Sequence, residues 1–487
     1  MSRHAADPAP RGCATVPPVP EPATKTPRRR LWPRLLAAFV LLLVAAGIFA
    51  AGWVLPTATG FVAKNACSAV FVASRDPAQI LAEDLAPYPY VSVSVDRDQQ
   101  LVRATVLGLA ARTAVYRPGL GCALTITVAP EHLRKQGFEP PRAAPSRAPW
   151  PLGDGDPATI TPSGVDRVAL DAAVAAGFAE PNPASLRRTR AVVVIHNGEL
   201  VAERYADGFD RDTRHLGWSM SKSITGALVG VLVGRGQLDI QAPAPVPAWA
   251  GDPRRDITID QLLRMSSGLE FEERYGALAD ATHMLFELDD AAAFALAKPR
   301  AHPPDSIFSY SSATTNILSW IVRQQFADDA AYHRFPHEAL FGPIGMRSAV
   351  FETDAAGTFV GSSYVYATAR DWARFGLLYL QDGVWNGTTI LPPGWVEYSR
   401  TPTPTSENRE YAAHFWANAG DPQDPSKRRF PHLPPDAYQA SGFQGQAVLI
   451  VPSRNTVIVR LGMTHDRPAW DLDPFAAGIL AALPAAS

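Results

Sequence analysis

The chain has 487 residues, of which 47% are hydrophobic and 19% charged, and its formal net charge is -2. This length exceeds that of one ordinary domain, and the composition is that of a globular protein with a large buried core. A net charge so close to zero gives no electrostatic reason to expect a nucleic-acid partner, and we expect none.

The N-terminus has two parts. Residues 1–30 are rich in proline, alanine and arginine without hydrophobic periodicity, which predicts a disordered cytoplasmic tail. Residues 31–56 contain an apolar run, Leu35 to Leu55, of the length that an α-helix needs to cross a bilayer, and arginines precede it. By the positive-inside rule we expect a signal-anchor, a single-pass membrane protein with a cytoplasmic N-terminus and the remaining chain extracytoplasmic (periplasmic). A cleaved signal peptide is the alternative, but the run is long for one and no clear A-x-A site follows it.

Two cysteines fit this topology. Cys67 and Cys122 would both lie in an oxidising compartment, where a disulfide persists, so we predict a Cys67–Cys122 bridge. Two buried free thiols are the alternative, because spacing alone does not show that the Cα atoms come close enough.

Three regions follow the apolar run. Residues 57–140 alternate short helical and strand-like runs and predict a small α/β module. Residues 141–158 are rich in proline and predict a linker, and residues 159–487 form the large domain. The module either positions the large domain over the membrane or supplies one wall of its cleft, and the sequence leaves both roles open.

The large domain combines strands from its two ends. Asn197-Gly198 lies between two β-rich runs, the strongest short signal for a tight hairpin, and a second hairpin is expected around Pro452 to Asn455. Most segments between them have helical spacing. We therefore predict an α/β fold of the α+β kind, with an antiparallel sheet built from both ends of the domain and an inserted helical subdomain.

One motif points to nucleophilic chemistry. Ser219-Met-Ser-Lys222 is an S-x-x-K at the start of an apolar helical run, which places the two side chains next to each other. A serine hydroxyl needs a nearby base, and a desolvated lysine can be neutral enough to serve. The alternative is that Ser219 only caps the helix. Ser221 and Ser223 have no lysine three residues on and are interpreted as packing serines.

We expect neither a metal nor a cofactor. His333 and His337 are four residues apart, but Pro336 lies between them and spoils the helix face that a metal pair needs. No cysteine stands near them at metal spacing.

Two further motifs follow Ser219 and Lys222 in order. Tyr310-Ser311-Ser312 precedes a helical run, and a later strand is entered through Ser441-Gly442-Phe443 and Gly445. With the segments TIDQLLRMSSGLEF, LFGPIGM and YAAHFWAN, this order resembles the β-lactamase-related serine hydrolase superfamily over residues 160–487. The resemblance is strongest to the branch of aminohexanoate-dimer hydrolases and esterases, which is related to class C β-lactamases and penicillin-binding peptidases.

The resemblance implies the β-lactamase/transpeptidase-like fold and a role for each motif. Ser219 would attack a carbonyl carbon, Lys222 would hold or take its proton, and Tyr310 would pass that proton to the leaving group. The backbone N–H groups of Ser219 and Phe443 would form the oxyanion hole. Five residues would contact substrate: Trp218, Ser312, Ser441, Gly442 and Gly445. A buried aromatic with a satisfied hydroxyl is the alternative for Tyr310, and core packing is the alternative for Trp218.

Two departures from the family pattern limit the substrate. Ser312 stands where β-lactamases and peptidases have the Asn of Tyr-x-Asn, and Ala440 stands where they have a Lys or His. A substrate-orienting amide and a cation for a substrate carboxylate are therefore missing, which argues against β-lactams and D-Ala-D-Ala peptides. We predict a membrane-anchored serine hydrolase of small esters or amides. The alternatives are a non-catalytic binding or cell-envelope scaffold protein of the same fold, or a cell-wall D-amino-acid peptidase.

Overall fold

The computed structural model describes the chain except for residues 1–11, 13, 20–30, 142–145, 158–162 and 485–487. The chain forms two compact units, Met1–Phe49 and Ala50–Ser487. The first unit contains helix α1, Leu31–Phe49. The tail that the sequence predicts as disordered, residues 1–30, lies mostly outside the described residues.

The membrane anchor expected at residues 31–56 is not found. No helix in the described part of the chain is both long and apolar enough to cross a membrane. The apolar run is divided: α1 ends at Phe49, a π-helical turn η1 spans Ala50–Val54, and helix α2 begins at Leu55 in the second unit. The prediction of a single-pass membrane protein is therefore wrong, and the cytoplasmic and periplasmic placements that depended on it fall with it.

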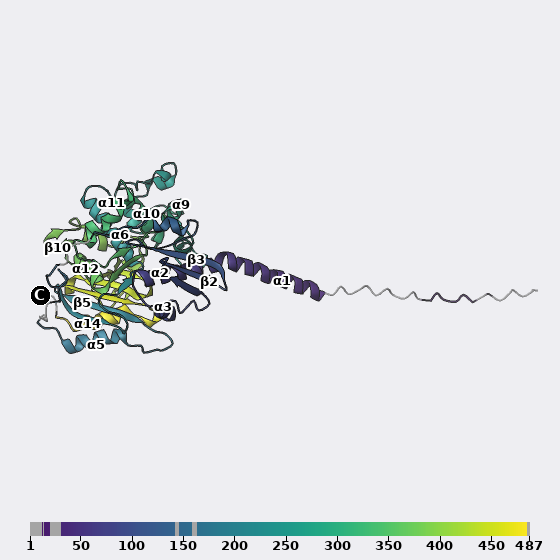
Figure 1. The fold of residues 1–487 in the computed structure, drawn as a ribbon, viewed down its shortest axis with the longest axis horizontal. Helices are drawn as coiled ribbons and strands as arrows, with labels where there is room; N and C mark the ends of the chain where they lie inside the picture. The colour runs from purple at the N-terminus through teal and green to yellow at the C-terminus, as the bar shows by residue number, and fades with distance from the viewer. Residues whose placement is uncertain (1–11, 13, 20–30, 142–145, 158–162, 485–487) are drawn as a thin grey trace, which may run out of the picture. The chain divides into compact units, whose positions relative to one another are not determined.

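A six-stranded antiparallel sheet forms the centre of the second unit, in the order β12-β13-β14-β15-β5-β6. Its strands come from both ends of the large domain, as the sequence predicts: β5 Thr189–His196, β6 Glu199–Tyr205, β12 Trp416–Ala417, β13 Tyr438–Gly442, β14 Gln446–Val451 and β15 Thr456–Gly462. Helices α5, Arg167–Phe178, and α14, Leu472–Ala481, lie together along the sheet, and α12, Ala369–Leu380, packs on β14, β15 and β5 (Figure 1).

The hairpin that joins β5 to β6 shows how the sequence determines this sheet. Asn197 and Gly198 both have positive φ, 53° and 80°, which is the conformation that an Asn-Gly turn between antiparallel strands adopts. All eight residues of β5 are buried, because the strand lies inside the sheet between β15 and β6. Its centre, residues 191–195, is an unbroken apolar run, as expected for a strand that is buried on both faces.

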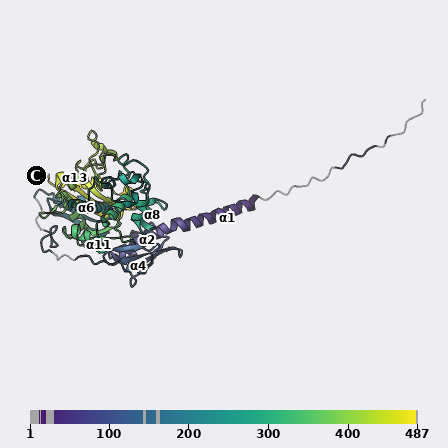
Figure 2. The ribbon, with the colours of Figure 1, turned by 90° about the horizontal axis from the view of Figure 1, so that it is seen from above.

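Helices fill most of the chain between β6 and β12. They include α6 Met220–Gly234, α7 Ile259–Leu263, α8 Asp280–Phe286, α9 Ala291–Ala297, α10 Ser312–Arg323, α11 Asp329–Pro336 and α13 Trp395–Arg400. The same region contains two small sheets. One has the strand order β7 (Arg214–Leu216), β9 (Val365–Thr368), β8 (Val350–Phe351), and the other pairs β10 (Val384–Trp385) with β11 (Thr388–Thr389). Helix α6 lies inside this region, and almost all of its residues are buried (Figure 2). The predicted inserted helical subdomain is confirmed.

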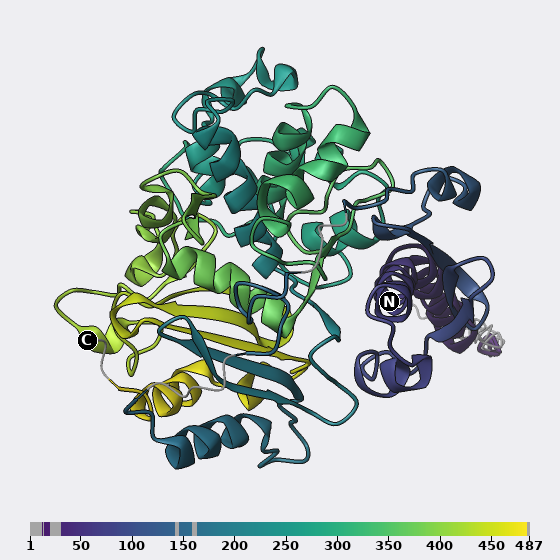
Figure 3. The same ribbon diagram turned by 60° about the vertical axis from the view of Figure 1, so that its left-hand side comes forward.

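Residues 50–134, here called the four-stranded region, fold around one long helix. Helix α2, Leu55–Phe71, packs on an antiparallel sheet of β1 Ser92–Asp96, β2 Leu101–Val106, β3 Leu109–Arg117 and β4 Gly121–Leu124, with short helices α3 Pro77–Glu83 and α4 Pro130–Arg134 (Figure 3). A disulfide joins Cys67 of α2 to Cys122 of β4, with the Cα atoms 6.1 Å apart, so the predicted bridge is confirmed.

Part of the stretch expected to be a linker packs on the large domain. Trp150 is buried, and the Arg374 guanidinium of α12 donates hydrogen bonds to the carbonyl groups of Pro151 and Gly153. Residues 146–157 therefore form part of the structure that surrounds the sheet.

Candidate active site

The start of helix α6 presents Ser219 to Lys222. The Ser219 hydroxyl makes no capping hydrogen bond to the helix backbone, and Lys222 Nζ lies 3.0 Å from Ser219 Oγ. Ser219 is half-buried and Lys222 is buried. The residue before the serine, Trp218, has a φ of 49°, a strained conformation for a bulky side chain and one that occurs at functional sites.

The two neighbouring serines have structural contacts. Ser221 Oγ accepts a hydrogen bond of 2.9 Å from the Val365 N–H, and Ser223 Oγ donates one of 2.6 Å to the His414 carbonyl. Both side chains hold α6 to adjacent segments, which leaves Ser219 as the serine at this helix start that faces the lysine.

The contacts of Lys222 determine where its amine points. Besides Ser219, its Nζ contacts Ser312 Oγ at 3.0 Å and the Ser362 carbonyl at 3.1 Å. Ser312 donates its own hydroxyl proton to Glu273, at 2.7 Å, so its oxygen accepts from the lysine. A neutral amine would use its two N–H groups on Ser312 and Ser362, which directs its lone pair at the Ser219 hydroxyl.

Because Lys222 is buried, a substantial fraction of its amine is neutral near neutral pH. Desolvation lowers the pKa of Lys222 to about 8, and the negative charge of Glu273 opposes this effect. Glu273 is separated from the lysine by Ser312, whose N–H it also accepts at 2.6 Å. The lysine can therefore exchange a proton in the ordinary working range of an enzyme.

Tyr310 lies against the same two residues. Its ring centroid is 4.9 Å from Lys222 Nζ, and its hydroxyl interacts with the Ser219 side chain. Burial and then the charge of Glu273 raise the pKa of Tyr310, and the contact with Ser219 opposes this. The phenol is therefore protonated at neutral pH and can donate a proton, whereas Lys222 is the group that can accept one.

The end of strand β13 lies beside the start of α6. A Cβ atom on Gly442 would lie 2.1 Å from the carbonyl oxygen of Gly217, so only glycine fits at this point. The next residue, Phe443, packs its ring edge-on against Trp218 with centroids 5.7 Å apart. The predicted oxyanion-hole residues Ser219 and Phe443 thus lie on two segments in direct contact.

The remaining predicted substrate residues lie in different places. Ser312 contacts Lys222 and Glu273, so its oxygen is already engaged. Gly445 has a φ of 83°, and a Cβ atom there would lie 2.4 Å from Arg460 Nη1. Ser441 lies on β13, the strand that contacts helix α6. Both belong to the frame of this sheet edge.

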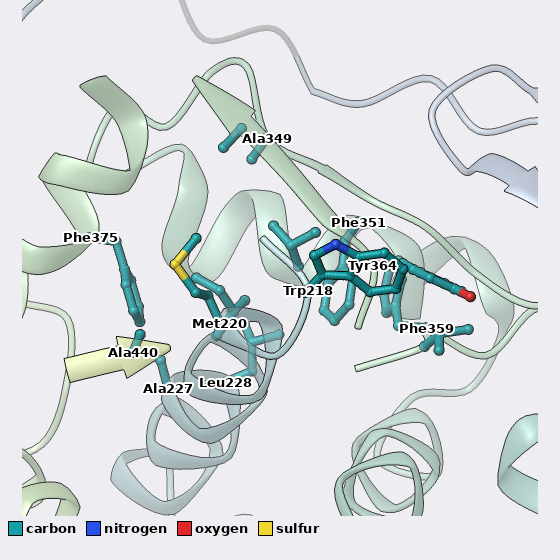
Figure 4. Close-up of a cluster of buried hydrophobic side chains, with 14 of the residues drawn as sticks. Trp218, Met220, Ala227, Leu228, Ala349, Phe351, Phe359, Tyr364, Phe375 and Ala440 are labelled. Atoms are coloured by element: carbon teal, nitrogen blue, oxygen red, sulfur yellow. The ribbon is translucent and has the colours of Figure 1, made fainter. Parts of the chain in front are cut away.

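Ala440 lies in the core. It is buried in the hydrophobic cluster that also contains Met220 and Phe375 (Figure 4). The position at which related enzymes have a cation therefore supplies none here.

Sequence reasoning missed two residues of this site, Glu273 and Tyr275. Tyr275 stacks on Phe443 with ring centroids 5.2 Å apart, and its hydroxyl interacts with Ser219. Both lie on the irregular stretch between α7 and α8. An acid-rich run without periodicity was the only signal, and nothing in it distinguishes Glu273 from the exposed Glu270 and Glu272.

Comparison with known proteins gives the family. The beta-lactamase family matches residues 178–478, more than half of the chain. The chain is similar to the 6-aminohexanoate-dimer hydrolase of Paenarthrobacter ureafaciens, at 28% identity over 320 residues, 60% of this chain and 77% of that protein.

Solved structures show the same fold. A family VIII carboxylesterase superposes with a TM-score of 0.51 at 16% identity, covering 65% of this chain and 96% of its own. A penicillin-binding protein homologue from Caulobacter crescentus superposes with a TM-score of 0.51 at 17% identity, covering 67% of this chain and 100% of its own. These structures show the fold, and the family match establishes that the chain is a serine hydrolase belonging to the beta-lactamase family.

Proposed function

We propose that this protein hydrolyses small esters or amides through an acyl-enzyme formed on Ser219. The observation that carries the proposal is the placement of Lys222, whose amine lies 3.0 Å from Ser219 Oγ while its other two contacts are hydrogen-bond acceptors. The mechanism requires this arrangement, because a serine hydroxyl attacks a carbonyl only when a base removes its proton.

In acylation, Ser219 Oγ attacks the carbonyl carbon and its proton passes to Lys222 Nζ. The carbonyl oxygen becomes an oxyanion, which the N–H groups of Ser219 and Phe443 would stabilise. Tyr310, whose phenol is protonated at neutral pH, donates its proton to the leaving alcohol or amine as the tetrahedral intermediate collapses. The proton held by Lys222 then restores the Tyr310 phenol.

In deacylation, a water molecule attacks the acyl carbon. Its proton passes through the same groups, and Ser219 Oγ leaves as a hydroxyl. Lys222 returns to the neutral state with its lone pair at Ser219, so the cycle closes without a change in any other residue.

The site favours uncharged substrates. Ala440 supplies no cation for a substrate carboxylate, and the Ser312 hydroxyl is held between Lys222 and Glu273. Esters and short amides therefore fit better than β-lactams or D-Ala-D-Ala peptides, and the similarity to an aminohexanoate-dimer hydrolase supports an amide as well as an ester bond.

The test compares the full chain with Ser219→Ala on p-nitrophenyl acetate and butyrate, with Ser223→Ala as the matched control. We expect Ser219→Ala to lose about 10³-fold or more in kcat/KM, whereas Ser223→Ala stays within about threefold. Intact mass after reaction with a slow ester should show one acyl group in the wild type and none in Ser219→Ala. Equal activity of the wild type and Ser219→Ala would overturn the proposal.

A further inference from the structure

A cavity of about 320 Å³ lies between the large domain and the four-stranded region, and Trp218, the residue before Ser219, lines it. This volume is at the lower end of the range for small-molecule sites. The large domain contributes Trp218, Tyr275 and Phe443 to its lining, and the four-stranded region contributes Ala58, Phe61, Tyr88 and Tyr90.

Aromatic rings connect the two sides of this cavity. Phe61 stacks on Trp218 with centroids 6.3 Å apart and contacts Tyr88 at 5.0 Å. Trp218 also contacts Phe443, with centroids 5.7 Å apart, and Tyr275 stacks on Phe443 at 5.2 Å. Because Trp218 immediately precedes Ser219, a ligand on this aromatic surface would lie next to the serine.

Buried polar contacts hold the four-stranded region in place. Lys64 of α2 forms a buried ion pair of 2.6 Å with Glu352, and Arg117 of β3 donates a hydrogen bond of 2.7 Å to the Thr353 carbonyl. A Cβ atom on Gly60 would lie 2.4 Å from the Phe286 carbonyl oxygen, so α2 and α8 meet backbone to backbone. Phe61, which α2 contributes to the cavity wall, is therefore fixed relative to the large domain.

Trp218 itself is held from the same side. Its indole N–H donates a 3.1 Å hydrogen bond to Gln444 Oε1, and Gln444 Nε2 lies 3.4 Å from His465 Nδ1. The other ring nitrogen of His465 lies 2.7 Å from the carbonyl of Glu83, at the end of α3. A polar chain thus runs from the four-stranded region to the residue that precedes the nucleophile.

The lining also defines the chemistry of the ligand. None of the described lining residues is a lysine or an arginine, and Asp84 is engaged by Arg75 and Arg190. The cavity therefore offers aromatic surface without a free cation, which suits an uncharged apolar or aromatic group.

We propose that the four-stranded region, which lies outside the matched residues 178–478, determines substrate preference by binding an apolar or aromatic group next to the scissile bond. This inference rests on the proposed function, since it assigns the substrate class of the same site. Ala58 and Tyr90 are specificity-determining residues of this wall, and the substrate is an ester or amide with a bulky uncharged group on one side of its carbonyl.

The experiment uses the full chain and two substrate series. One series lengthens the acyl chain of p-nitrophenyl esters from acetyl to decanoyl, and the other enlarges the alcohol of acetate esters from methyl to 2-phenylethyl. Ala58→Phe adds bulk to the cavity, and Ala82→Phe, at an exposed position of α3 outside the lining, is the matched control.

We expect the wild type to prefer the bulky members of one series. Ala58→Phe should lower kcat/KM for those members about tenfold or more and leave the acetyl or methyl member within about threefold, a size of effect typical of a misfit in an apolar pocket. Ala82→Phe should match the wild type. If Ala58→Phe changes kcat/KM in the acyl series, the acyl group occupies the cavity; if it changes kcat/KM in the alcohol series, the leaving group does.

A preference that is the same in the wild type and Ala58→Phe across both series would overturn the inference while leaving the proposed function intact, because Ser219→Ala tests that separately. If Ala58→Phe does not fold, Tyr90→Ala, which removes a half-exposed ring from the wall, replaces it. We expect Tyr90→Ala to weaken the bulky preference, and an unchanged preference would overturn the inference equally.

Discussion

Two buried lysines, Lys222 and Lys64, have opposite surroundings. Lys64 forms a 2.6 Å ion pair with Glu352, a 2.9 Å hydrogen bond with Ser68, and lies 3.9 Å from the centroid of the Tyr364 ring. In the part of the chain that the structure describes, the hydrogen bonds of Lys222 all go to uncharged oxygens, and Glu273 is linked to it through Ser312. Both lysines have a serine close to the amine.

The comparison teaches that burial and a neighbouring serine do not suffice to make a base. Burial lowers the pKa of both amines, but a carboxylate in direct contact with Lys64 favours its charged form. None of the described carboxylates contacts Lys222 directly, so this lysine can lose its proton and act on Ser219. Lys64 therefore stabilises the contact between the four-stranded region and the large domain, whereas Lys222 takes part in catalysis.

The largest expected effect is the loss of the base. Lys222→Met removes the proton acceptor of Ser219 and should lower kcat/KM by about 10²- to 10⁴-fold with the fold retained. Lys222→Arg keeps a positive charge that cannot be given up, so it should be as inactive as the Met variant. Ester hydrolysis and circular dichroism check both, and an active Lys222→Arg enzyme would show that charge rather than basicity matters.

The same change at the other lysine should affect stability. Lys64→Met leaves Glu352 buried without its cation, which should lower the free energy of unfolding by about 3–5 kcal/mol. The double variant Lys64→Met with Glu352→Gln should recover part of that loss. Urea unfolding measures it, and a variant as stable as the wild type would contradict a structural role for the pair.

A smaller effect is expected when Glu273 loses its charge. Glu273 raises the pKa of Lys222, so Glu273→Gln should lower that pKa and move the acid limb of kcat/KM to lower pH, by about one unit. The Gln carbonyl still accepts a hydrogen bond from Ser312. If the acid limb of the kcat/KM profile stays in place or moves to higher pH, Glu273 does not raise the pKa of Lys222.

Features that depend on residues close together in the chain could be predicted from the sequence. The three-residue spacing of Ser219 and Lys222 on an apolar helix predicts that their side chains meet, and Asn197-Gly198 predicts the hairpin, because both depend on nearest neighbours along the chain. The order of the motifs with Tyr310 and Phe443 predicts the family. The Cys67–Cys122 bridge was also anticipated, although its partners belong to different elements.

Other features depend on contacts that no local pattern encodes. Glu273 turns toward Ser312 from an irregular stretch, and Phe61 meets Trp218 from a distant part of the chain. The anchor prediction was wrong because hydropathy counts apolar residues but does not show where a helix ends. In the structure α1 stops at Phe49, and the end of the apolar run belongs to the second unit.

The most direct test of the account is the pH dependence of kcat/KM for p-nitrophenyl acetate in the wild type between pH 5 and 10, with far-UV circular dichroism at each pH as the control for folding. Lys222 must be neutral to accept the Ser219 proton, and its pKa is about 8. We predict a plateau above that value and a fall of about tenfold per pH unit below it. A flat profile from pH 5 to 9 in a folded protein would contradict the assignment of Lys222 as the base.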